Sequence, residues 1–153
     1  MKATKAAALV FGIALAVLAA IGPARAAEDT REMVTLPQPM QEHMLGNMRD
    51  HLLALGEVFH LLAEDKIDEA RKTAEMRIGM SSLELHGASH MAPYMPPGMR
   101  AAGTEMHKAA SRFAAVAQTA QIERTYEAQQ KVFAALAAVT ETCNACHTAY
   151  RIR

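Results

Sequence analysis

Two cysteines and a histidine near the C-terminus combine residue types and a spacing suited to covalent chemistry. Cys143, Cys146 and His147 lie in the segment Cys-Asn-Ala-Cys-His, which holds both cysteines of the chain. On a helix, positions i, i+3 and i+4 share one face. Two thiols on that face can bond the two vinyl groups of one porphyrin, and the adjacent imidazole can ligate the iron. Because this spacing is the signature of c-type haem attachment, we predict one covalently bound haem c.

Other interpretations of the motif are weaker. A thioredoxin-like redox pair lies near a βαβ unit, and no strand pattern of useful length is present. A zinc site needs a fourth ligand and leaves the position of His147 unexplained. A disulfide between Cys143 and Cys146 would constrain very little chain. A chance match to the motif is the remaining alternative.

The first 26 residues have the layout of a secretory signal peptide. Lys2 and Lys5 precede an uncharged apolar stretch, residues 6–21, and small residues lead up to a cleavage position after Ala26. The apolar stretch is short for a membrane-spanning helix, which needs about 20 residues. We therefore expect cleavage rather than stable membrane insertion, which places a domain of residues 27–153 in the periplasm. Export fits the motif, because c-type haem is attached outside the cytoplasm.

Charge and composition exclude several classes of function. Three basic residues leave with the signal peptide, so the 16 basic residues of the chain fall to 13 against 16 acidic ones. No basic patch suggests nucleic-acid binding. No paired carboxylates or Ser-His-Asp set can be assembled with any specificity, so we expect no enzyme. The chain has no Trp and is rich in Ala, Leu and Met, which favours helices over strands.

Hydrophobic periodicity predicts four amphipathic helices. They run from about Pro39 to Ala63, from about Ile67 to Gly87 or His90, from about Met99 to Ala120, and from about Tyr126 through the motif. Short connections between them predict an all-α fold, an antiparallel up-down four-helix bundle with the haem attached to the C-terminal helix. In the first helix the expected inward stripe is Leu45, Met48, Leu52, Leu55, Phe59 and Leu62. In the fourth it is Tyr126, Phe133, Leu136, Thr140, Cys143, His147 and Tyr150.

A haem motif in the last helix of a four-helix bundle resembles the class II c-type cytochromes, which are cytochrome c-prime and its low-spin, methionine-ligated relatives. The resemblance covers the mature chain in architecture, and in specific residues mainly residues 143–151. It implies a periplasmic monohaem protein with redox partner proteins and a possible homodimer through the first two helices. It also implies that Tyr150 packs near the proximal side of the haem and that Arg151 lies near a propionate or the proximal imidazole.

The sixth ligand of the iron decides what such a protein does. In the family the first helix supplies the residue facing that position, and Met48 fits the methionine-ligated branch best, with Met44 as the runner-up. The Arg-Gln pair that often precedes the family's ligand is absent here. Ligation by His147 and Met48 predicts an electron carrier. The alternatives are a core methionine at Met48 and a five-coordinate haem protein that binds NO or CO.

A second group of soft ligands lies between the second and third expected helices. The group consists of two histidines one turn apart and three methionines at spacing four: His86, His90, Met91, Met95 and Met99. Thioether and imidazole ligands suit Cu(I), so a copper-binding protein is a further alternative. A packed helix end and loop is the simpler interpretation. The remaining histidines, His43, His51, His60 and His107, are expected at the surface or its boundary.

Overall fold

The computed structural model describes residues 28–153, and the expected signal peptide lies outside the described residues. This part of the chain is mostly helical, with a small two-stranded sheet. In chain order its elements are β1 (Glu32–Val34), α2 (Gln38–Ala63), α3 (Ile67–Arg77), η1 (Met80–Ser82), α4 (Ala88–Met91), η2 (Ala92–Tyr94), α5 (Pro97–Glu123), α6 (Tyr126–Ala149) and β2 (Tyr150–Ile152). Among these helices none is long and apolar enough to cross a membrane.

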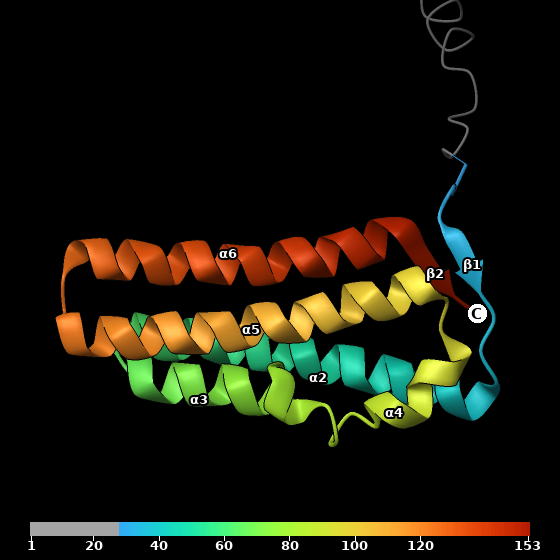
Figure 1. Ribbon diagram of the computed structural model, residues 1–153, viewed down its shortest axis with the longest axis horizontal. Coiled ribbons are helices and arrows are strands. Elements are labelled where there is room, and N and C mark those ends of the chain that lie inside the picture. The colour runs from blue at the N-terminus through green and yellow to red at the C-terminus, as the bar shows by residue number, and fades with distance from the viewer. Residues whose placement is uncertain (1–27) are drawn as a thin grey trace, which may run out of the picture. The chain divides into compact units, whose positions relative to one another are not determined.

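The helices α2, α3, α5 and α6 lie lengthwise beside one another (Figure 1). α3 packs against both α2 and α5, and α5 packs against α6. β1 and β2 pair in parallel, with Val34 opposite Ile152, so the chain end is fastened to the segment before α2. Figure 1 shows this strand pair at the end of the helices that also carries the α4 segment.

Local sequence explains where the long helices begin. α2 and α5 each have a proline in the first turn, where the missing N–H is no loss. α6 begins after Thr125, whose hydroxyl accepts a hydrogen bond of 3.1 Å from the backbone N–H of Ala128. Arg124, with φ 52°, makes the sharp turn between α5 and α6. The third helix therefore ends at Glu123, slightly later than the expected limit near Ala120.

The main core joins all four long helices around small side chains. Phe113 on α5, Val58 on α2 and Val132 on α6 are fully or almost fully buried. Many of the other buried positions are alanines, which let neighbouring helices approach closely. A second, smaller core at the β1–β2 end is built largely from methionines.

The second predicted helix is too long. It ends at Arg77 instead of Gly87 or His90, because Gly79 adopts an extended conformation, with φ −70° and ψ −175°. The carboxylate of Glu75 then accepts hydrogen bonds from the backbone and the hydroxyl of Ser81, which stabilises the turn into η1. The residues expected to continue this helix form η1, a turn and α4.

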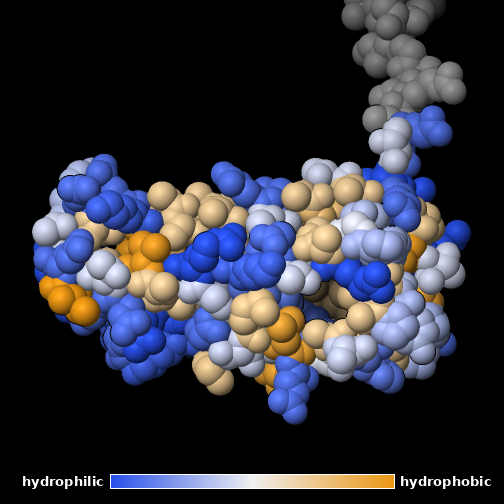
Figure 2. Space-filling view, in the orientation of Figure 1, coloured by the Kyte–Doolittle hydropathy of each residue, from blue (hydrophilic) through white to orange (hydrophobic). Residues whose placement is uncertain are grey.

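The buried faces of α2 and α6 are rotated from the predicted stripes, which are confirmed only in part. Leu136 is buried, and Leu55, Leu62 and Cys143 pack against the main core. α2 buries Met44, His51, Ala54 and Val58, whereas Leu45, Leu52 and Phe59 are exposed. α6 buries Ala128, Val132, Leu136 and Val139, whereas Tyr126 and Phe133 are exposed. Of the long helices, α2 packs mainly against α3, and α6 packs mainly against α5. On the face in Figure 2, hydrophobic residues lie among hydrophilic ones.

Candidate functional site

The Cys-x-x-Cys-His motif lies in the last two turns of α6. Cys143 and Cys146 are free and half-buried, and His147 is exposed. Burial raises the pKa of both thiols, and the neighbouring Cys143 adds to the rise at Cys146. Because α6 is helical through Ala149, the three side chains project from one stretch of helix surface, as the motif requires.

The two cysteines contact different cores. Cys143 packs against the main core, whereas Cys146 packs against the smaller core at the β1–β2 end. We call the methionines of this smaller core the methionine cluster, which comprises Met40, Met44, Met48, Met91, Met95 and Met99. Cys146 therefore lies beside a surface rich in polarizable thioethers, contributed by α2, by α5 and by the segment between α3 and α5.

The structure places Met48, the predicted axial ligand, against the same small core as Cys146. Met48 is partly buried and packs against the small core together with Cys146. Met44, the runner-up, is buried, with 8% of its surface exposed. Both methionines belong to the cluster, so burial alone does not separate the two candidates.

An open apolar pocket of about 240 Å³ separates α2 from α6 just before the motif. Phe59 from α2 lines one side, and Phe133, Leu136, Ala137 and Thr140 from α6 line the other. Thr140 precedes Cys143 by three residues, so the pocket lies within one helical turn of the first thiol. The apolar residues that the rotated helix faces expose, Phe59 and Phe133, thus lie in this pocket.

Tyr150 and Arg151 follow the motif in β2. Tyr150 packs against the methionine cluster. Arg151 is half-buried and lies opposite Met33 in the strand pair. Both residues are therefore held close to the motif by the β1–β2 pairing.

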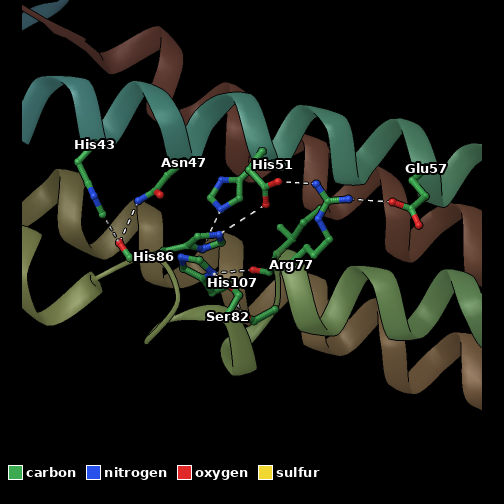
Figure 3. Close-up of polar contacts among 11 residues, drawn as sticks. His43, Asn47, His51, Glu57, Arg77, Ser82, His86 and His107 are labelled. Atoms are coloured by element: carbon green, nitrogen blue, oxygen red, sulfur yellow. Dashed lines mark hydrogen bonds and ion pairs between the residues drawn. The ribbon is translucent and has the colours of Figure 1, made fainter.

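Three buried histidines form a second site that the sequence did not predict. His51 on α2, His86 in the turn between η1 and α4, and His107 on α5 point toward one another (Figure 3). We call them the histidine cluster. Their exposed fractions are only 5–8%. One ring nitrogen from each lies within 4.8 Å of one nitrogen of each of the other two. The expectation that His51 and His107 lie at the surface or its boundary is wrong.

Hydrogen bonds hold the ring of His107 and the backbone of His86 in place. Nδ1 of His107 is 2.5 Å from the carbonyl oxygen of Ile78 and must donate to it, since a carbonyl only accepts. The carbonyl of His86 accepts hydrogen bonds from Nε2 of His43 at 2.8 Å and from the amide of Asn47 at 2.9 Å. Two α2 side chains thus fix the backbone of His86.

Gly87 lets this turn form. It adopts a left-handed conformation, with φ 59° and ψ 36°, which is strained for residues that carry a Cβ. A Cβ at this position would also lie 3.1 Å from Nε2 of His43. Both the conformation and the close approach therefore require glycine directly after His86.

Burial opposes protonation of two of the three imidazoles, those of His51 and His86. Burial lowers the pKa of His51 to about 4, with smaller contributions from the neighbouring imidazoles. Burial is also the main cause of the lowered pKa of His86. A carboxylate oxygen of Asp50 lies 3.8 Å from Nε2 of His86. Asp50 is itself paired with Arg77, whose guanidinium holds the pKa of that carboxyl below its usual range and also contacts Glu57 at 2.8 Å.

The soft ligands of the copper alternative are divided between two sites. His86 belongs to the histidine cluster, whereas His90 is exposed. Met91, Met95 and Met99 belong to the methionine cluster. Helical periodicity is the sequence signal that could have placed two members of the histidine cluster on buried helix faces. His51 continues the buried face of Met44, and His107 continues the series Ala110, Ala114 and Ala117.

Comparison of the chain with known proteins identifies no relative. No protein-family model matches the chain, and no curated protein or solved structure is significantly similar to it.

Proposed function

We propose that the chain is a periplasmic monohaem c-type cytochrome that carries electrons. The observation that carries the proposal is the Cys-x-x-Cys-His motif on α6, with its second cysteine packed against a methionine cluster from which a thioether ligand can come. In this proposal Cys143 and Cys146 hold one haem c through thioether bonds, and His147 and Met48 ligate its iron. Arg151 lies near a propionate or the proximal imidazole.

The residues present fit a haem. Two free thiols at i and i+3 and an exposed imidazole at i+4 supply the donor set of a c-type site. A porphyrin face is apolar and needs apolar neighbours. The pocket containing Phe59 and Phe133 lies on one side of the cysteine pair along α6, and the methionine cluster lies on the other.

Each part of the chain has a distinct task in this proposal. The bound haem supplies one-electron redox chemistry. The two cysteines keep it attached whatever the local packing does. A methionine ligand raises the reduction potential relative to a second imidazole. The buried methionines and aliphatic residues around Cys146 exclude water from the site.

The finer architecture belongs to the same proposal. α2, α3, α5 and α6 would be the four helices of an antiparallel up-down bundle of the class II cytochrome type, with haem on the last helix. The neighbour packing of α2 with α3, α3 with α5 and α5 with α6 supports this arrangement. The β1–β2 pair and the α4 segment would then be additions at the end of the bundle that carries the motif.

Covalent attachment is tested first. The full chain is produced in a host that matures c-type cytochromes, and the purified protein is denatured and stripped of non-covalent haem. We expect one haem per chain to remain in the wild type. Cys143→Ala and Cys146→Ala variants should each hold haem by a single bond or lose it. A wild-type protein that keeps no haem after this treatment contradicts the proposal.

The axial ligand is tested by optical and electron-paramagnetic-resonance spectra, with and without CO. We expect a low-spin wild type that does not bind CO. A Met48→Ala variant should be high-spin and bind CO, while Met40→Ala, at a partly buried methionine of the same cluster, should remain like the wild type. A low-spin Met48→Ala with a high-spin Met44→Ala would transfer the role to Met44. A high-spin, CO-binding wild type would support the gas-binding alternative instead.

A further inference from the structure

We propose that His51, His86 and His107 bind a divalent transition-metal ion of the zinc type, at a site separate from the Cys-x-x-Cys-His motif. The three side chains come from three different segments of the chain and converge in the interior (Figure 3). This proposal does not rest on the presence of haem, because none of its residues belongs to the motif or to the methionine cluster.

The spacing of the ring nitrogens matches a metal centre. Ligands at about 2.0–2.1 Å from a tetrahedral zinc lie about 3.3 Å from one another. Nε2 of His51 and Nδ1 of His86 are 3.2 Å apart. A nitrogen of His107 lies within 4.8 Å of a nitrogen of each partner. Binding of an ion would have to draw these atoms together to about 3.3 Å.

The outer nitrogens of His107 and His86 have surroundings like those of metal-binding histidines. Metal-bound histidines usually donate their second N–H to a backbone carbonyl or a carboxylate, which fixes the tautomer. Nδ1 of His107 donates to Ile78, which leaves its Nε2 with the lone pair. Nε2 of His86 faces the carboxylate of Asp50 at 3.8 Å, which favours a proton there and a lone pair on Nδ1.

Without a bound ion, the hydrogen-bonding groups of the histidine cluster are only partly paired within the described residues. Nδ1 of His51 and Nε2 of His86 are buried and make no hydrogen bond within residues 28–153. A buried polar atom without a partner costs about 1–3 kcal/mol. The three rings contact one another edge to face or tilted, with centroids 4.5–5.9 Å apart. Apolar side chains would fill this space at lower cost, so packing alone does not explain three imidazoles here.

The donor chemistry identifies the class of ion. Imidazole nitrogen suits zinc, copper, nickel and iron, whereas calcium and magnesium require oxygen ligands. Three histidines leave one position of a tetrahedron for water or another small ligand. The carboxylate of Asp50 beside His86 places a negative charge near the cation. Zn²⁺ is the reference ion for this set, and Cu²⁺ is its strongest competitor by affinity.

The test measures metal content. The purified holoprotein is treated with a chelator, desalted, equilibrated with Zn²⁺ or with Cu²⁺, and desalted again. Metal is then measured by mass spectrometry relative to protein from amino-acid analysis, and haem is measured separately. We expect one zinc per chain in the wild type and a loss of at least tenfold in His51→Gln, His86→Gln and His107→Gln. His60→Gln, at an exposed histidine on α2, is the matched control and should load like the wild type.

Two results overturn the proposal. One is a wild type that retains less than a tenth of an equivalent of either metal. The other is equal loading in the cluster variants and His60→Gln. If the single variants do not fold, zinc-edge X-ray absorption on the loaded wild type decides, because three imidazoles at about 2.0–2.1 Å are required. A wild-type protein that binds no zinc but keeps its haem rejects this site alone. A wild-type protein that binds zinc but keeps no haem rejects the cytochrome alone.

Discussion

Replacing Gly87 by alanine tests the turn that directs His86 into the interior. Gly87 has φ 59°, and its Cβ position lies 3.1 Å from Nε2 of His43. A left-handed residue with a Cβ costs about 1–2 kcal/mol. The close contact adds to this cost unless the His43 ring moves, and that ring is hydrogen-bonded to the carbonyl of His86. We therefore expect Gly87→Ala to lower the free energy of unfolding by at least about 1–2 kcal/mol.

The matched control is Gly56→Ala on α2. Gly56 lies inside the helix, and an added Cβ meets no atom within 4 Å. Alanine is favoured over glycine in a helix by about 0.5–1 kcal/mol, so this variant should be more stable than the wild type. The two glycine-to-alanine changes should thus have opposite signs, although they add the same methyl group.

The assay is denaturant unfolding of the chelator-treated protein, followed by the same measurement after zinc loading. Gly87→Ala should lose more stability in the zinc-loaded state than in the metal-free state, because the added Cβ disturbs the bond from His43 that holds His86. Gly56→Ala should give the same change in both states. A Gly87→Ala protein as stable as the wild type would refute the left-handed turn and the inward position of His86 that depends on it.

Three further predictions concern the core, the ion pairs and the two proposed centres. Phe113→Ala should lower the free energy of unfolding by about 3–5 kcal/mol, because the ring is fully buried. Ile122→Ala on the same helix, where the side chain is 78% exposed, should change it little. Thermal unfolding measures both variants. A double-mutant cycle of Arg77→Ala and Glu57→Ala should give a coupling energy of about 0.2–1 kcal/mol, and zero coupling would mean that their 2.8 Å contact adds nothing to stability. Zinc loading should raise the haem reduction potential, since a nearby dication favours the less positive reduced iron. His107→Gln should abolish this rise in a potentiometric titration.

Helix limits follow closely from the sequence where proline or a charged break sets them. The first helix was expected from about Pro39 to Ala63 and runs from Gln38 to Ala63. The second helix shows what periodicity misses. Its apolar positions continue past Arg77, but the chain leaves the helix at Gly79, where hydrogen bonds from Ser81 to Glu75 stabilise the turn. This helix end depends on contacts between a side chain and the following turn, and hydrophobic periodicity does not predict such contacts.

The inward faces were harder to predict than the helices. Large residues such as Leu52 and Phe59 defined the expected face of α2, but its true contacts are made through Ala54 and Val58. Helices that pack closely do so through small side chains, so the widest apolar stripe is not always the buried one. Phe59 instead lines the pocket beside the motif.

The histidine cluster could not be predicted as a site, because its members lie far apart in the sequence. Periodicity alone could have placed His51 and His107 on buried faces. Their meeting with His86 depends on the early end of α3 and on the turn at Gly87. Both features depend on individual residues rather than on periodicity.

Helix α2 connects the two proposed centres. Met48 and His51 are three residues apart, so their side chains are neighbours on the helix, with Cβ atoms about 5–6 Å apart. Met48 packs with Cys146 against the smaller core, and His51 lies against His86 and His107. A small rotation of α2 would therefore move both side chains together, because one rigid helix carries them. Metal binding at His51 would fix that rotation and with it the position of Met48, which supplies a physical route by which one centre constrains the other.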